Sequence, residues 1–307
     1  MSGPAIGSRL RVRAPAKVNL TLRILERLPS GFHALETLFQ AIDLCDSLEV
    51  EVRRESGVAL EVVGADVGPA DDNLVVRAAR AWLAETSVEW GLAVRLTKAI
   101  PAGAGLGGGS SDAGAMLRVL DHWMPGAVAE ERRLAIGAEL GSDVPFFTGK
   151  GGLVLGRGRG ERMTPLPPLP PAWLVVGMPR VHVATGPAYG RLARGRAESR
   201  GAVPPPLFDG ESAVPRSWPE VASLALNDFE PVVAGAHPPI ATALAAIRAQ
   251  HPAFALLSGS GAAVFGLFTD ADAAERAVGE ARAACPESRF ELARTLDRLP
   301  AVEPAGP

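Results

Sequence analysis

Pro101-Ala-Gly-Ala-Gly-Leu-Gly-Gly-Gly-Ser-Ser111 is the strongest signal in this sequence, and five glycines lie in it. Residues 92–96 before it have the pattern of a strand, and residues 112–123 after it have that of a helix. A glycine backbone can approach a ligand closely, and the first turn of a helix offers unpaired N–H groups at the positive end of its dipole. Ser110 and Ser111 add hydroxyl groups where a phosphate oxygen or a hydrated Mg²⁺ would lie. The stretch therefore predicts a cradle for an oligophosphate.

Three other interpretations of this stretch compete with that prediction. Gly103, Gly105 and Gly108 match G-x-G-x-x-G, but a dinucleotide fold needs a parallel strand–helix–strand unit, whereas residues 47–63 favour an antiparallel hairpin. A P-loop requires Gly-Lys followed by Ser or Thr, and no lysine lies in or directly after the stretch. A flexible linker would lack the strand and the helix that hold both ends. A nucleoside triphosphate loop of neither common type fits best.

The composition excludes several classes of protein. The 307 residues carry 31 Lys and Arg against 34 Asp and Glu, so nothing in the net charge of -3 favours nucleic acid or a membrane surface as a partner. Hydrophobic residues make up 47%, which excludes a disordered chain. The sequence shows no signal peptide and no apolar run of about 18 residues, and its two cysteines have no ligand spacing, so we expect a cytoplasmic protein.

Lysine, asparagine and tyrosine are scarce in a chain that is rich in arginine. They are Lys17, Lys98 and Lys150, Asn19, Asn73 and Asn227, and Tyr189. A GC-rich genome explains the scarcity. Arginine occupies most basic positions in this chain. A position that carries lysine instead is therefore more often one where the chemistry requires lysine.

Apolar periodicity predicts elements on both sides of the glycine-rich stretch. Before the stretch we expect strand pieces over 9–25, an antiparallel hairpin over 47–63 and a helix over 74–83 that Asn73 would help to cap. After it we expect a helix over 130–140 that ends at Gly141.

A change in composition at residues 157–171, which end in a proline-rich run, marks a boundary. We place it between a first domain over 1–160 and a second over 161–307. The second half is expected to be α+β, with strands over 173–178 and 262–268 and helices over 240–248 and 271–284. Residues 194–219 are expected to form a mobile connection, and the residues from Leu299 onward a frayed tail.

Three short motifs elsewhere carry titratable or aromatic side chains. Asp143 lies at a turn fixed by Pro145, and the simplest interpretation is that it caps that turn. Lys17 and Asn19 lie two residues apart on one face of a strand, where a single lysine is usually solvated. Gly31-Phe32-His33 is a turn, and such a turn is more often a packed corner than a site.

These motifs occur in a fixed order over some 250 residues, and together they resemble the GHMP kinase superfamily. They are Pro15-Ala-Lys-Val-Asn-Leu20, Gly31-Phe-His33, Pro101 to Ser111, Gly141-Ser-Asp-Val-Pro145, Asn227-Asp-Phe-Glu230 and Ser258-Gly-Ser-Gly261. The resemblance implies a two-domain α+β fold, with a mixed or antiparallel N-terminal sheet and a ferredoxin-like C-terminal domain. It also implies an active site in the cleft between the domains.

Within the superfamily, the Lys17 and Phe32-His33 motifs resemble those of a branch that acts on a cytidine diphosphate-linked methylerythritol. The resemblance implies ATP-dependent phosphorylation of the 2-hydroxyl of that substrate, a step in making isoprenoid precursors without mevalonate. Asp143 matches the catalytic aspartate that would accept or orient the hydroxyl proton, and Lys17 matches the lysine that would hold Asp143 and favour the alkoxide. An arginine would not replace that compact ammonium easily.

The resemblance also implies two sets of binding residues. The substrate set comprises Asn19 and His33 for the cytosine edge, Asp143 and Thr185, and Phe32 and Tyr189 stacking on opposite sides of the base. Phe32 stands where the family commonly has tyrosine, and Ala184 stands where serine is expected before Thr185. The ATP set comprises Asn73, Lys98, Pro101, Ala102, Gly103, Ala104, Gly105, Leu106, Gly107, Gly108, Gly109, Ser110 and Ser111. Mg²⁺ is implied with ATP, but the sequence assigns no protein ligands to it beyond the carboxylate of Asp143.

Two rival functions remain at this point. A GHMP kinase acting on another alcohol, such as mevalonate or homoserine, would have no base to stack on the Phe32-His33 turn. A silent nucleotide-binding module would keep the fold without the chemistry, and the presence of both Lys17 and Asp143 argues against it. The sequence leaves monomer and homodimer open.

Overall fold

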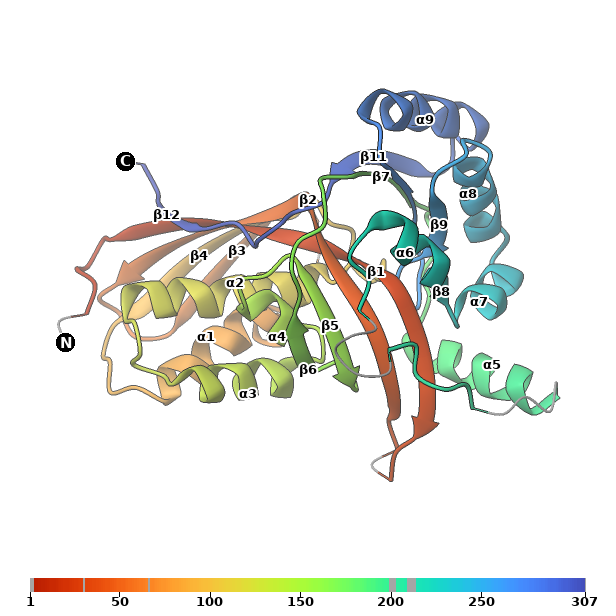
Figure 1. Ribbon diagram of the computed structural model, residues 1–307. Coiled ribbons are helices and arrows are strands. Elements are labelled where there is room, and N and C mark those ends of the chain that lie inside the picture. The colour runs from red at the N-terminus through yellow and green to blue at the C-terminus, as the bar shows by residue number, and fades with distance from the viewer. Residues whose placement is uncertain (1–2, 30, 66, 199–202, 209–213, 307) are drawn as a thin grey trace.

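The structure is a computed structural model that describes residues 3–29, 31–65, 67–198, 203–208 and 214–306. It contains two β-sheets with helices packed on them, and the long strands β1 (Arg9–Arg27) and β2 (His33–Arg53) run past both (Figure 1). Leu22 and Ile24 of β1 share a buried cluster with Val264 of the second sheet, so the two sheets pack on each other along these strands. The α+β class expected from the sequence is confirmed.

The first sheet is mixed and has eight strands. Its order is β12-β1-β2-β4-β3, with β5 and β6 continuing from β2 and β8 pairing with β1. The β3–β4 and β1–β8 pairs are parallel, and the others are antiparallel. The remaining bounds are β3 Val58–Val63, β4 Gly91–Thr97, β5 Leu153–Gly158, β6 Arg162–Pro165, β8 Leu226–Asn227 and β12 Val302–Pro304.

The antiparallel hairpin expected over residues 47–63 is wrong. Both parts form strands, but β4 lies between them, antiparallel to β2 and parallel to β3. Alternating apolar and charged residues define a half-buried strand, but they do not specify its partner. The crossover β3–α1–β4, through α1 (Leu74–Ala84), is therefore a parallel strand–helix–strand unit. A dinucleotide fold would need the glycine-rich stretch inside such a unit, and here the unit ends before the stretch begins. This connectivity therefore argues against a dinucleotide fold.

Four helices cover one face of the first sheet (Figure 1). They are α1, α2 (Gly108–Trp123), α3 (Glu130–Leu140) and α4 (Val144–Thr148), and a short 3₁₀ helix at Ala70–Asp72 precedes α1. Asn73 caps α1 as expected, because its side chain accepts a hydrogen bond from Val75 N. The apolar face of α2, which includes Met116, Leu117 and Leu120, is buried against the sheet.

The second sheet is antiparallel, with the order β11-β7-β10-β9. Its strands are β7 (Trp173–Met178), β9 (Phe254–Leu257), β10 (Val264–Phe268) and β11 (Arg289–Arg294). With α8 (Pro238–Arg248) between β7 and β9, and α9 (Ala271–Ala284) between β10 and β11, it has the ferredoxin-like topology expected from the resemblance. Three further helices, α5 (Thr185–Glu198), α6 (Trp218–Leu224) and α7 (Glu230–Ala236), lie between β7 and α8 in the chain.

The connection expected over residues 194–219 begins later than predicted, because α5 continues to Glu198. Part of it, residues 199–202 and 209–213, lies outside the described residues. The segment between these gaps is fastened to β2 by Glu36, whose buried carboxylate accepts hydrogen bonds from Leu207 N at 2.7 Å and Phe208 N at 2.9 Å. The segment around Phe208 is therefore anchored to the first sheet.

The frayed tail expected from Leu299 onward is also wrong. Residues 302–304 form β12, which pairs with Leu10 to Val12 at the edge of the first sheet. Arg118 of α2 donates to Pro300 O, and Leu299 N donates to Lys150 O. The sequence of β12 is polar and proline-rich, so its local pattern does not indicate a strand. Its partner strand, β1, lies at the other end of the chain. Both termini consequently lie at the same end of the first sheet (Figure 1).

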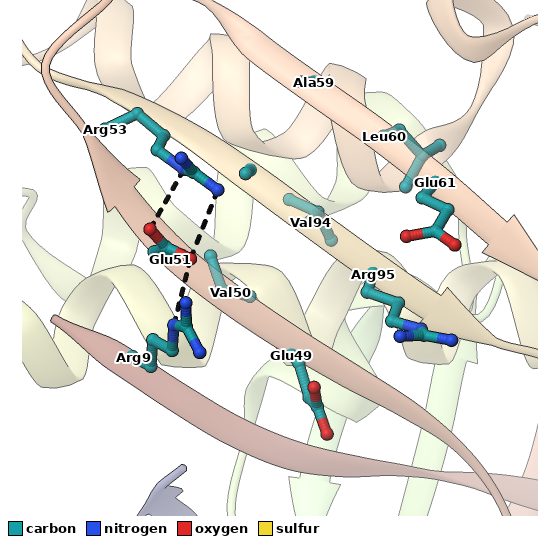
Figure 2. Close-up of a pocket in the computed structure, with 11 residues that line it drawn as sticks. Arg9, Glu49, Val50, Glu51, Arg53, Ala59, Leu60, Glu61, Val94 and Arg95 are labelled. Atoms are coloured by element: carbon teal, nitrogen blue, oxygen red, sulfur yellow. Dashed lines mark hydrogen bonds and ion pairs between the residues drawn. The ribbon is translucent and has the colours of Figure 1, made fainter. Parts of the chain in front are cut away.

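The face of the first sheet opposite its helices carries rows of charged side chains. Figure 2 shows Arg9 and Arg53 on either side of Glu51, and Arg95 beside Glu49 and Glu61, around a shallow pocket. Arg9 Nε lies 2.9 Å from Glu51 Oε2, so these charges compensate one another on a solvated surface. Within the described residues, no helix is long and apolar enough to cross a membrane.

Candidate active site

The glycine-rich stretch Pro101–Ser111, which we call the glycine loop, joins β4 to α2. Gly107 precedes α2 with φ 73° and Gly105 has φ 76°, a region that favours glycine. A Cβ at Gly105 would lie 2.2 Å from Ser258 O, so glycine is also required there for the close approach of a second segment. The predicted loop therefore leads directly into the N-terminus of a 16-residue helix.

The glycine loop is held from both sheets. Lys17 N of β1 donates to Leu106 O at 2.9 Å, and Ala263 N, directly before β10 of the second sheet, donates to Ala104 O at 2.9 Å. Ser258 Oγ adds a hydrogen bond to Gly105 O at 3.0 Å. The loop is thus a fixed part of the structure, as the strand and helix at its ends predict.

Asn227, whose role the sequence did not reveal, organises the segment that contacts the glycine loop. Its Nδ2 donates to Leu257 O at 2.7 Å and Gly259 O at 2.8 Å, while its Oδ1 accepts from Phe229 N at 2.9 Å. All three polar contacts use the side chain of a buried residue. Asn227 therefore fixes the turn Ser258–Gly261 against the loop.

Lys17 and Asp143 meet beside the glycine loop. Lys17 Nζ donates to Asn19 Oδ1 at 2.8 Å and to Gly105 O at 2.9 Å, and it lies 3.4 Å from Asp143 Oδ2. The Lys17 side chain is 4% exposed, so this lysine is not the solvated residue that a lone strand lysine usually is. Asp143 precedes α4 but makes no capping hydrogen bond with its side chain, so its carboxylate remains available.

These residues line a cleft of about 400 Å³, which we call the inner cleft. From the predicted sets, its walls include Lys17, Asn19, Asp143, Thr185, Tyr189, Pro101, Ala102, Gly103, Ala104, Gly105, Gly107, Gly108, Gly109 and Ser110. The N–H groups of the first turn of α2 carry partial positive charge, and the ammonium of Lys17 adds a full one. The inner cleft is suited to bind an oligophosphate beside a carboxylate that can accept a proton.

Four residues of the predicted ATP set are not among those that line the inner cleft. Leu106 is 1% exposed within an apolar cluster, and Ser111 is fully buried. The side chain of Asn73 caps α1. Lys98 is buried between Asp46 and Asp112, so its ammonium does not face the cleft. The sequence does not show these two carboxylate partners, and a role of Lys98 as an ATP ligand stays a prediction.

A second cavity of about 650 Å³, the outer cavity, adjoins the inner cleft. It is lined by Arg27, Gly31, Phe32, His33, Ser142, Arg159, Thr185, Gly186, Tyr189, Gly190 and Ala193, and it shares Ser142, Arg159, Thr185 and Tyr189 with the inner cleft. Phe32 is 55% exposed, so the Gly31–His33 turn is not a packed corner. The structure thus brings Phe32, His33, Thr185 and Tyr189 together, as predicted.

The rings of Phe32 and Tyr189 in the outer cavity each contact a different neighbour. Tyr189 stacks on His33, with ring centroids 4.8 Å apart and an interplanar angle of 14°. The guanidinium of Arg159 instead lies over the ring of Phe32, with Arg159 Cζ 5.1 Å from the ring centroid. The stacking of a base between Phe32 and Tyr189 therefore stays a prediction.

Burial and charge set the ionisation of two groups in this cavity. Burial lowers the pKa of His33, and the nearby guanidinium groups of Arg27 and Arg196 lower it further. Burial raises the pKa of the Tyr189 hydroxyl, with an added contribution from Asp143. His33 is therefore neutral at physiological pH, with one ring nitrogen able to accept a hydrogen bond.

Arg159, which no motif in the sequence indicates, lies where the inner cleft and the outer cavity meet. Its backbone N donates to Glu161 Oε2 at 2.6 Å, which holds the turn between β5 and β6. The sequence offered only Arg157-Gly-Arg-Gly160, which we interpreted as a boundary between domains. The pairing of β5 with β2, which brings Arg159 to the cleft, is visible only in the folded chain.

Among the described residues, no group of three or more His, Cys, Asp or Glu side chains forms a metal site. Asp143 is the carboxylate found among the described residues that line the inner cleft. Mg²⁺ bound with a nucleotide usually takes one or two carboxylates and keeps phosphate oxygens and waters as its other ligands. The donor set of the cleft fits a Mg²⁺ ion that arrives with ATP.

Two family models match the sequence. GHMP kinases N terminal domain matches residues 73–151, which include the glycine loop and Asp143. GHMP kinases C terminal matches residues 212–287, which include Asn227 and the turn Ser258–Gly261.

Relatives and solved structures agree with these models. The 4-diphosphocytidyl-2-C-methyl-D-erythritol kinase of Solibacter usitatus is 42% identical over 87% of this chain and 84% of its own length, and that of Geobacter sp. (strain M21) is 37% identical over 89% and 94%. A crystal structure of 4-(cytidine 5'-diphospho)-2C-methyl-D-erythritol kinase has a TM-score of 0.76 at 35% identity, covering 93% of this chain and 98% of its own. A homoserine kinase from Cytophaga hutchinsonii, with a TM-score of 0.70 at 19% identity and coverage of 98% and 99%, shares the fold. The chain belongs to the GHMP kinase family, among the 4-diphosphocytidyl-2-C-methyl-D-erythritol kinases.

Proposed function

We propose that this chain transfers the γ-phosphoryl group of ATP to the 2-hydroxyl of 4-diphosphocytidyl-2-C-methyl-D-erythritol, with Asp143 and Lys17 as the catalytic residues. The observation that carries the proposal is the Lys17–Asp143 pair, 3.4 Å apart, located between the glycine loop and the aromatic outer cavity. A phosphate chain and a cytidine group can then approach the pair from two different sides.

Asp143 accepts the proton of the acceptor hydroxyl as that oxygen attacks the γ-phosphorus, and the bond from phosphorus to the β,γ-bridging oxygen of ATP breaks. The ammonium of Lys17 stabilises the negative charge on the attacking oxygen and holds the carboxylate in place. Lys17 is itself fixed by Asn19 and Gly105 O, so it is positioned before the substrate arrives. In this assignment Asn19 orients Lys17 in addition to any hydrogen bond that it makes with the cytosine edge.

The N-terminus of α2 and the glycine loop hold the triphosphate. Mg²⁺, when bound with ATP, neutralises charge on the β- and γ-phosphoryl oxygens, and Asp143 would be the protein carboxylate within its reach. Gly107 cannot carry a larger side chain without displacing its neighbours, because a Cβ there would lie 3.1 Å from both Lys17 Cγ and Phe147.

The outer cavity holds the cytidine diphosphate end of the acceptor. Phe32 and Tyr189 present ring faces to the base, and neutral His33 offers a donor and an acceptor to its edge. Arg159 lies between this end and Asp143, where the diphosphate of the acceptor would pass, and its guanidinium matches phosphate oxygens.

The test is ATP consumption by the purified protein with no acceptor, with the cytidine-linked substrate, with mevalonate and with homoserine. We expect turnover with the cytidine-linked substrate and only background with the others, since neither small alcohol fills the outer cavity. Phosphorylation of mevalonate or homoserine without turnover of the cytidine-linked substrate would overturn the substrate assignment. Binding of ATP without turnover of any acceptor would indicate a silent nucleotide-binding module.

A further inference from the structure

A buried cluster of three charged side chains lies behind the glycine loop. Lys98 Nζ contacts Asp46 Oδ2 and lies 2.7 Å from Asp112 Oδ2. The three side chains are 0 to 4% exposed, and they come from β2, the segment after β4, and α2. Lys98 contacts both carboxylates at once, so a single ammonium links three elements.

The cluster contacts both ends of the glycine loop. Before the loop, Asp46 Oδ1 accepts hydrogen bonds from Ala99 N at 2.6 Å and Ile100 N at 2.8 Å. After the loop, Asp112 follows Ser111 in the first turns of α2. Lys98 also lies close to the backbone of Gly108, since a Cβ at Gly108 would lie 3.3 Å from Lys98 Nζ.

We propose that the Lys98–Asp46–Asp112 cluster positions the glycine loop for ATP, with Lys98 acting through the loop and not as an ATP ligand. The proposal rests on the proposed use of the loop for ATP, and it is independent of which alcohol is phosphorylated. Lys98 fixes the distance between residues 98–100 and the start of α2, and therefore the conformation of the phosphate-binding backbone between them. It is a positioning residue in this assignment.

The charges of the cluster support this arrangement. Burial raises the pKa of Asp112 to about 7 and Asp46 raises it as well, while Lys98 opposes both and so limits the rise. Burial opposes the charge of Lys98, but Asp112 and Asp46 outweigh it and raise the pKa of the lysine. The ammonium is strongly held, so leaving the cluster to bind ATP would strand two buried carboxylates.

The first experiment compares two Asp→Asn variants on the same helix. Asp112→Asn removes the negative charge from the link between Lys98 and α2, so that at most a neutral hydrogen bond is left, and it keeps a balanced Lys98–Asp46 pair. Asp121→Asn, the matched control, removes the ion pair of Asp121 with Arg133 near the other end of α2. Calorimetric titration with ATP in the absence of acceptor measures the loop directly. We expect Asp112→Asn to weaken ATP binding about tenfold and Asp121→Asn to leave it within about twofold.

The second readout separates positioning from a general loss of stability. In steady-state assays, Asp112→Asn should raise KM for ATP and leave KM for the cytidine-linked substrate within about twofold. Equal weakening of ATP binding by both variants, or equal increases in both KM values, would overturn the proposal. Tighter ATP binding by Asp112→Asn would overturn it too, because it would mean that Asp112 competes with ATP for Lys98.

A third variant keeps the proposal testable if Asp112→Asn fails to fold. Lys98→Arg retains the positive charge, but its wider guanidinium cannot reproduce the compact contact of one ammonium with Asp46 and Asp112. We expect faster hydrogen exchange at the amides of residues 101–111 and weaker ATP binding. A folded Lys98→Arg variant with wild-type exchange and wild-type ATP affinity would contradict the proposal. Because none of these binding measurements needs an acceptor, their failure is distinguishable from an incorrect substrate assignment.

Discussion

The inner cleft and the outer cavity are built in different ways. In the inner cleft, Lys17 is 4% exposed and has three polar partners, and the glycine loop is hydrogen-bonded to both sheets. In the outer cavity, Phe32 is 55% exposed and its neighbour is a cation instead of a packed core. The Lys17–Asp143 pair is therefore positioned before any substrate binds, whereas we expect the outer cavity to be completed by the ligand that covers it.

The largest expected effect is in the inner cleft. Asp143→Asn removes the proton acceptor while keeping the shape of the side chain, so kcat should fall at least about a hundredfold. ATP affinity, measured by calorimetry, should change little because the loop is held by other residues. Asp71→Asn, at an exposed position paired with Arg80, is the matched control and should leave kcat unchanged. Wild-type kcat in Asp143→Asn would refute the catalytic role of this carboxylate.

The next effect tests the outer cavity. Phe32→Ala removes one ring from the base site, and we expect KM for the cytidine-linked substrate to rise about tenfold, within the range for loss of one stacking partner. Because Phe32 is exposed, the melting temperature and KM for ATP should stay at their wild-type values. Leu292→Ala, a truncation of another exposed apolar side chain, is the control for surface effects. A change in KM for ATP instead would mean that the two regions are not separate.

A smaller effect is expected where the two regions join. Arg159→Gln removes the charge that we assign to the diphosphate of the acceptor, and KM for that substrate should rise about fivefold, since the guanidinium is partly exposed and screened. Arg95→Gln, on the opposite face of the first sheet (Figure 2), removes the same charge far from the cleft. Cytidine without phosphates should inhibit wild type and Arg159→Gln equally. Unequal inhibition would place Arg159 on the base instead.

A separate effect is expected on the stability of the region behind the loop. Asp112 has a pKa of about 7 in the folded chain, above its ordinary value of 3.8, because it is buried near Asp46 despite Lys98. Between about pH 4 and about pH 7 the unfolded chain releases this proton and the folded chain keeps it, so this group lowers stability as pH rises through that window. The melting temperature of wild type minus that of Asp112→Asn should therefore decrease from about pH 5 to about pH 7 and then level off. A difference that increases with pH would contradict this assignment.

The sequence predicted the parts that local patterns specify. Helices over 130–140 and 271–284 have the predicted bounds, and Lys17, Asp143 and the glycine loop lie together as their motifs imply. Those motifs were informative because each combines residue types with a narrow chemical use. Asn19 and Tyr189, both scarce residue types, also line the inner cleft.

Long-range partners were not predictable from local patterns. The strand at 58–63 alternates in the same way whether it pairs with β2 or, as in the structure, with β4. Lys98 looks the same in the sequence whether it faces ATP or two carboxylates 52 and 14 residues away. Arg159 gains its position from the pairing of β5 with β2. Each of these depends on contacts between distant segments.

The pairing of β12 with β1 affects how the protein is made on the ribosome. Strand β1 emerges early in synthesis, while the residues that cover its edge at Leu10–Val12 are added only after the other strands of both sheets have been translated. An uncovered strand edge can pair with the edge of another chain. Arg9, Arg11 and Arg13 point outward along this part of β1. Charged side chains along an uncovered strand edge disfavour its pairing with the edge of another chain until β12 closes the sheet.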